Sequence, residues 1–140
     1  ISLSLSRCVQ IGALYSGLAL TTSEILNNTG SCAPEFQSKN QLKEAVQQKQ
    51  EEFKLNDISI LVETDPYLYQ SSDAYANSRQ VYDNVYQLKF DSKYGMNGLS
   101  VNHELCHIKL GHLRSQHNLL VRHLFYEPEA ALCSIGVQVR

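Results

Sequence analysis

The 140-residue chain lacks the features of several broad protein classes. No apolar run approaches the roughly 18 residues that a membrane-spanning helix needs, so no membrane span is expected. Lysine and arginine are scattered and the net charge is −2, so no basic surface for nucleic acid is expected. Internal repeats and low-complexity segments are missing as well. With 43% hydrophobic and 19% charged residues, the composition predicts one globular domain over residues 1–140.

The four cysteines show no C-x-x-C spacing, which argues against a cysteine zinc knuckle or a redox pair. Their wide spacing fits two disulfides in an oxidising compartment, and also four buried thiols in the cytoplasm. If disulfides form, we expect the pairs Cys8–Cys32 and Cys106–Cys133, which favours a secreted or periplasmic location. Polar side chains interrupt the apolar stretch over residues 6–26, so we expect a buried N-terminal helix rather than a secretory signal.

The first half of the chain continues with helical and extended patterns. Ser38 and Gln41 have the spacing of a capping box, and the apolar residues after them recur at helical spacing, which predicts a helix over about residues 39–55. The aliphatic run 58–62 predicts a short buried strand. Residues 67–79 are polar and tyrosine-rich without a clear period, so we expect a loop there.

The second half adds a hairpin and a late helix. Alternating residues over 85–91 predict a half-buried strand, which a tight turn at Asp83-Asn84 would pair with residues 80–82. Pro128 fits the first turn of a helix that runs to about residue 135. Mixed helices and strands of this kind predict an α+β fold.

The most informative stretch is residues 100–112, in which His103, Glu104 and His107 form an H-E-x-x-H pattern. On an α-helix, residues four apart project from one face, so the two imidazoles can occupy two corners of a tetrahedral zinc site. Glu104 lies beside them, where it can act as the general base on a water that the metal activates. The pattern therefore predicts Zn²⁺ as cofactor and hydrolysis of a peptide bond in a peptide or protein substrate.

Local sequence favours a helix around this motif. Asn97-Gly98 indicates a turn, Ser100 suits the N-cap and Gly111 suits the end of the helix. An apolar stripe is formed by Leu105, Ile108 and Leu110. The competing interpretation is an ordinary amphipathic helix with two surface histidines, but a helix this apolar rarely carries two histidines and a glutamate without a function.

A catalytic zinc site usually has three protein ligands, and the motif supplies two of them. His112 lies about 140° around the helix from His107 and would point away from the metal unless the helix ends first. The metzincin pattern is excluded, because leucines stand at the positions of its glycine and third histidine. A carboxylate on a following helix remains. The candidates for the third ligand are His112, His117, His123, Glu127 and Glu129.

The run H-E-L-x-H-x-x-x-G-H followed by E-x-E-A resembles the gluzincin zinc peptidases, and most closely the ImmA/IrrE-like family. The resemblance covers roughly residues 85–134. It implies a zincin-like fold, with a small twisted sheet packed on helices and a glutamate helix after the motif helix. It also implies that His103, His107 and Glu127 ligate zinc and that Glu104 is the general base. The family usually has Asn or Asp at the position of Ala131, so support for a ligand histidine must come from elsewhere.

The resemblance further implies a strand at the edge of the cleft, and we expect residues 85–90 to bind an extended substrate by strand addition. An oxyanion donor is also needed, for which the candidates include Tyr126, His112, His117 and His123. Two alternatives stay open. One is a zinc-binding module in which Ala131 reflects lost catalysis, and the other is an interaction protein without a metal.

Overall fold

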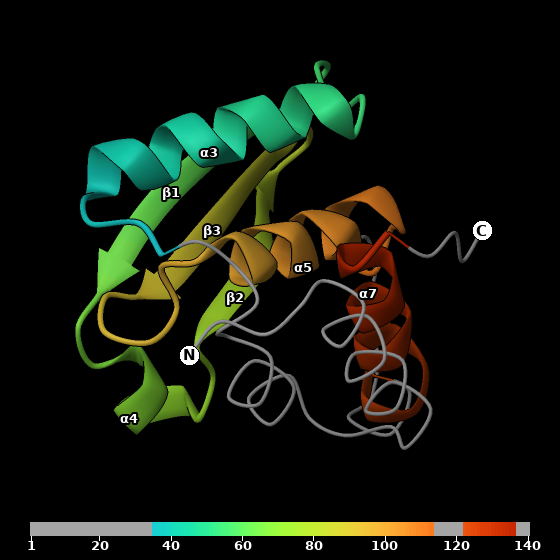
Figure 1. Cartoon of the computed structure of the whole chain (residues 1–140). Helices are drawn as coiled ribbons and strands as arrows, with labels where there is room; N and C mark the ends of the chain where they lie inside the picture. The colour runs from blue at the N-terminus through green and yellow to red at the C-terminus, as the bar shows by residue number, and fades with distance from the viewer. Residues whose placement is uncertain (1–34, 114–121, 137–140) are drawn as a thin grey trace.

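The computed structural model of the chain describes residues 35–113 and 122–136 (Figure 1). The expected N-terminal helix over residues 6–26 and the pair Cys8–Cys32 lie outside the described residues. The elements follow in the order α3 (Lys39–Glu52), β1 (Ser59–Asp65), α4 (Leu68–Ser72), β2 (Ala76–Tyr82), β3 (Val85–Asp91), α5 (Gly98–Lys109), the π-helical turn η2 (Arg122–Tyr126) and α7 (Glu127–Ser134). None of these helices is long and apolar enough to span a membrane.

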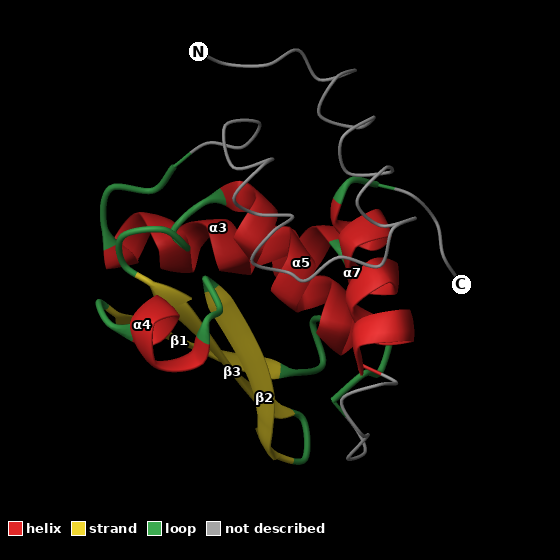
Figure 2. Cartoon of the chain, turned by 90° about the horizontal axis from the view of Figure 1, so that it is seen from below, coloured by secondary structure: helices red, strands yellow, loops and turns green. Residues whose placement is uncertain are grey.

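The strands of the described residues form a three-stranded mixed sheet in the order β1-β3-β2. The central strand β3 is parallel to β1 and antiparallel to β2. Helices α3 and α5 cover the same face of this sheet, and α7 packs against α5 (Figures 1 and 2). Tyr86, Leu88 and Phe90 alternate along β3 and are buried, as the period of two requires for a strand with one covered face. The expected α+β class is confirmed.

Helix α3 begins where the capping signature predicts. The Ser38 hydroxyl accepts a hydrogen bond from the Gln41 backbone N–H at 3.2 Å, and the Gln41 side chain accepts one from the Gln37 N–H at 2.9 Å. Leu42 and Val46 are buried in the core that the helix forms with the sheet. The helix ends at Glu52, slightly earlier than expected, because the chain turns there through a positive φ of 58° at Lys54.

Two predictions about the sheet region, one of a strand and one of a loop, need correction. The run 58–62 forms a strand as predicted, but the strand is not buried, because β1 lies at the edge of the sheet and only Val62 of its residues is buried. Residues 67–79 are not a loop, because they contain α4 and the start of β2. Ala76, Asn77 and Ser78 have low strand propensity, and their extended conformation depends on pairing with β3. The hairpin turn at Asp83-Asn84 is confirmed, with a positive φ of 59° at Asn84.

Helix α5 begins earlier in the chain than expected, at Gly98. Asn97 is the N-cap, and its side-chain oxygen accepts hydrogen bonds from the Ser100 backbone N–H at 2.9 Å and from the Ser100 hydroxyl at 3.1 Å. The expected N-cap at Ser100 is therefore wrong. Asparagine is as favourable an N-cap residue as serine, and Asn97 precedes Ser100 in the chain. The end of the helix is as expected: Gly111 has a positive φ of 76° and its N–H donates to the Ile108 carbonyl.

The connector from β3 to α5 sets the position of the motif helix. The buried Asp91 carboxylate accepts hydrogen bonds from the backbone N–H groups of Lys93 at 2.8 Å and Tyr69 at 2.9 Å. Gly95 lies against the backbone of Tyr75, so a Cβ at this position would overlap the Tyr75 carbonyl oxygen. A side chain at Gly95 must therefore displace the connector.

We predict that Gly95→Ala lowers the free energy of unfolding by about 1–3 kcal/mol, because the backbone must shift to remove this overlap. Urea unfolding followed by circular dichroism measures the change. Ser92→Ala is the control, since Ser92 is exposed in the same connector. Equal unfolding free energies for the two variants would contradict the prediction.

Candidate metal centre

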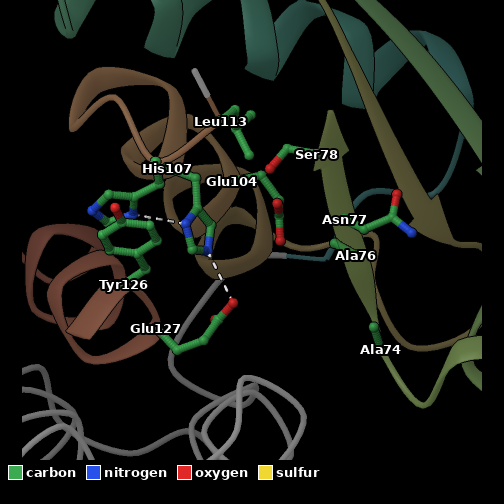
Figure 3. A pocket seen from close by; sticks show the side chains of 10 residues that line it. Ala74, Ala76, Asn77, Ser78, Glu104, His107, Leu113, Tyr126 and Glu127 are labelled. Atoms are coloured by element: carbon green, nitrogen blue, oxygen red, sulfur yellow. Dashed lines mark hydrogen bonds and ion pairs between the residues drawn. The ribbon is translucent and has the colours of Figure 1, made fainter. Parts of the chain in front are cut away.

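Three side chains converge at the junction of α5 and α7. His103 and His107 stand one turn apart on α5, and Glu127 is the first residue of α7. The His103 Nε2 atom lies 3.1 Å from His107 Nε2 and 3.0 Å from Glu127 Oε2. The distance from His107 Nε2 to Glu127 Oε1 is 3.4 Å. Figure 3 shows His107 and Glu127 turned towards each other. The structure thus brings together the two motif histidines and one of the two candidate glutamates.

These three separations suit a tetrahedral zinc ion. Zinc takes imidazole nitrogen and carboxylate oxygen at about 2.0–2.1 Å, which puts neighbouring ligand atoms about 3.3 Å apart. The two Nε2 atoms are 3.1 Å apart, and each lies close to one oxygen of Glu127, His103 to Oε2 at 3.0 Å and His107 to Oε1 at 3.4 Å. Two imidazoles and a carboxylate are also a donor set that zinc prefers. The residues present therefore fit the ion that the motif predicts.

The pKa of Glu127 is shifted by its surroundings. Burial on its own would raise the pKa of this carboxyl, but hydrogen bonds from His103 and His107, together with their charges, lower it further than burial raises it. The net result is a pKa well below the ordinary value for glutamate. The side chain is only 13% exposed, yet it is a carboxylate anion at neutral pH. A ligand oxygen therefore needs no deprotonation before it binds a cation.

Glu104 lines a pocket of about 110 Å³ beside the three converging side chains. It is 3% exposed, and Figure 3 shows its carboxylate between His107 and strand β2. Ala76 and Ser78 form the opposite wall on β2. The pocket has room for a water molecule or another small group beside this buried carboxylate. Its other lining residues include Leu113, Tyr126 and Glu127.

Comparisons of the chain with protein-family models, with curated proteins and with solved structures found no match. The resemblance to gluzincin peptidases therefore stays a prediction from the motif. The grounds for a functional proposal are the sequence and the geometry of this site.

The strand expected at the edge of the cleft is the wrong one. Strand β3 is central in the sheet and pairs on both sides, so its backbone is not available to a substrate. Strand β2 lies at the edge that borders the pocket, and no other described strand pairs with its outer side. The error follows from the loop prediction for residues 67–79, which hid the first half of β2.

The remaining candidates lie elsewhere around the site. Glu129 does not join the three converging atoms, because its Oε2 lies 2.9 Å from His112 Nε2. His112 lies on the far side of His107, with their Nδ1 atoms 3.0 Å apart. Tyr126 borders the pocket, but its ring lies flat on the His112 ring. His117 and the side chain of His123 lie outside the described residues.

The contact between His112 and His107 was missed by sequence reasoning. A continuous helix would point His112 away from its neighbour, but α5 ends at Lys109 and the positive φ of Gly111 turns the chain back. The signal in the sequence is Gly111 directly before His112, which allows a helix to end and the next side chain to return to it.

A disulfide joins the two helices that supply the converging side chains. Cys106, which precedes His107 on α5, is bonded to Cys133 on α7, so the expected pair is confirmed. The Asn102 side chain adds a hydrogen bond from α5 to the Ser134 carbonyl at 3.4 Å. Ala130 and Ala131 are buried, and their small side chains permit a close approach of α7. The position of Glu127 relative to α5 is therefore fixed covalently as well as by packing.

We predict that the double variant Cys106→Ala/Cys133→Ala loses about 2–4 kcal/mol of unfolding free energy, because its unfolded chain is no longer constrained by the bridge. Urea unfolding measures the loss. Each single variant removes the same bridge, so each should lose nearly as much as the double variant. Additive losses, or no loss at all, would show that the bridge does not stabilise the junction.

Proposed function

We propose that the chain is a zinc-dependent peptidase with a zincin-like active site at the junction of α5, α7 and β2. The observation that carries the proposal is the convergence of the two Nε2 atoms, 3.1 Å apart, on the Glu127 carboxylate. Its Oε2 lies 3.0 Å from His103 Nε2 and its Oε1 lies 3.4 Å from His107 Nε2. Glu104 faces the same pocket. Three ligand atoms, an adjacent buried carboxylate and room for a water form the arrangement that metal-assisted hydrolysis needs.

The residues divide the chemistry between holding the ion and moving protons. His103, His107 and Glu127 would hold zinc, which when bound acts as a Lewis acid and lowers the pKa of water to about 7. The Glu104 carboxylate would take a proton from the attacking water and deliver it to the leaving amine nitrogen. Because Glu104 is 3% exposed, bulk water does not compete strongly for its hydrogen bonds.

The edge strand supports a peptide as the substrate. The outer side of β2 borders the pocket, and its backbone groups can pair with an extended chain. Ala76 and Ser78 are small, so they leave space between this strand and Glu104. An extended peptide added to β2 would pass its backbone carbonyls along the side of the pocket that holds Glu104.

A zinc-binding module without catalysis is the second candidate. The observation in its favour is Ala131, an apolar residue at a position where the ImmA/IrrE-like family usually has Asn or Asp. In such a module the same three ligands would serve stability alone, and Glu104 would have no role in turnover.

We predict that Glu104→Gln retains stoichiometric zinc and lowers peptide cleavage by about 10²–10⁴-fold, because the amide cannot accept the proton. Metal analysis and a fluorogenic peptide library measure the two properties. Glu44→Gln on the exposed side of α3 is the control and should leave both unchanged. Wild-type cleavage rates in Glu104→Gln would reject Glu104 as the general base, and lack of cleavage by the zinc-loaded wild type would favour the module.

We also predict that Glu127→Gln weakens zinc binding far more than Glu129→Gln does, because only Glu127 contacts both Nε2 atoms. Competition with a chromogenic chelator measures the dissociation constants. The reverse order of affinities would assign the third ligand to Glu129.

A further inference from the structure

We propose that Glu129 and His112 form a relay that orients His107, so that Glu129 is a positioning residue for the metal site although it does not reach the metal. This inference rests on the proposed function, because it assigns His107 Nε2 to zinc. The relay consists of two contacts in series. His107 Nδ1 lies 3.0 Å from His112 Nδ1, and His112 Nε2 lies 2.9 Å from Glu129 Oε2.

The proton positions along the relay are consistent with one another. When Nε2 of His107 is the ligand atom, the neutral ring carries its proton on Nδ1 and donates it to His112 Nδ1. A neutral His112 must then carry its own proton on Nε2, where it donates to the Glu129 carboxylate. The carboxylate accepts only, so it selects this tautomer of His112. Without Glu129, His112 could place its proton on Nδ1, where it would face the proton of His107.

The backbone builds this contact at the end of α5. The His112 N–H donates to the His107 carbonyl at 3.0 Å, and the positive φ of Gly111 allows that return. His112 is therefore tied to His107 through both its main chain and its ring. The ring is held further by Tyr126, which stacks on it with centroids 4.1 Å apart and planes 8° apart. With 2% of its side chain exposed, His112 has little access to water as an alternative partner.

Helix α7 reaches the His107 ring from two sides, directly through Glu127 and indirectly through Glu129. Residues two positions apart on a helix differ by about 200°, so Glu127 and Glu129 project in nearly opposite directions. Glu127 meets His107 at Nε2, while Glu129 reaches its Nδ1 side through His112. The second contact supplies the support that Ala131 cannot give. Partners of this kind fix the ring orientation and the tautomer of a metal ligand.

The test is the zinc dissociation constant of the full chain, measured by chelator competition. Glu129→Ala and His112→Ala should each weaken zinc binding by about 10–100-fold, the effect expected of a lost partner of a ligand histidine. Because both act through one path, Glu129→Ala/His112→Ala should bind zinc no more weakly than His112→Ala alone. Glu129→Gln should recover part of the affinity, since its amide oxygen still accepts from His112 Nε2.

Two further measurements separate positioning from folding. Urea unfolding in the presence of chelator establishes that each variant is folded under the assay conditions, and Glu44→Ala serves as the charge control on α3. Nitrogen NMR of the imidazoles reports the tautomers directly. The zinc-loaded wild type should show His112 protonated on Nε2 alone, and Glu129→Ala should show a mixture of tautomers. If Glu129 and His112 only stabilised the fold, the tautomer of His112 would be the same in the wild type and in Glu129→Ala.

The outcomes distinguish the relay from the function beneath it. No zinc binding by the wild type overturns the proposed function and the relay together. Zinc binding that is equal in the wild type and in Glu129→Ala overturns the relay alone. Additive losses in the double variant overturn it as well, because the two residues would then act separately. If His112→Ala fails to fold, the comparison of Glu129→Ala with Glu129→Gln still decides between these results.

Discussion

The packing of α7 against α5 is the interaction on which the rest of the structure depends. Helix α5 carries His103, Glu104 and His107 among its buried residues, and each buried polar group without a partner would cost about 1–3 kcal/mol. The first turn of α7 supplies partners for both histidines, directly through Glu127 and indirectly through Glu129. A disulfide closes the same junction. The candidate site and the stability of this part of the fold therefore have a common origin.

Sequence reasoning succeeded where the geometry is local. The relation between His103 and His107 follows from helical periodicity, and the pair Cys106–Cys133 has the expected partner. Glu127 is brought to the histidines, as the resemblance implies, while Glu129 is not. A pattern of residues with fixed spacing on one helix can be interpreted without knowledge of the rest of the fold. The assignment of Glu127 as a zinc ligand stays a prediction.

Sequence reasoning failed where pairing between distant segments decides the structure. The residues that begin β2 have low strand propensity and become a strand because β3 lies beside them. That strand forms one wall of the pocket, so this wall was hidden in a segment expected to be a loop. The return of His112 was missed for a related reason. It depends on the positive φ of Gly111, which is not taken into account when the sequence is placed on a continuous helix.

The charges at the junction are compatible with the zinc ion that we propose. The carboxylates of Glu104, Glu127 and Glu129 lie on or beside the pocket. Glu129 is more exposed than Glu127, yet only 26% of its side chain is accessible to water. Like charges in a poorly solvated region repel, so they need compensation by protonated imidazoles or by a metal ion. A divalent cation at the three converging atoms would offset two of these charges and leave the imidazoles neutral. Neutral imidazoles are also what the proton order from His107 to Glu129 requires, so the metal and the relay favour the same state of the site.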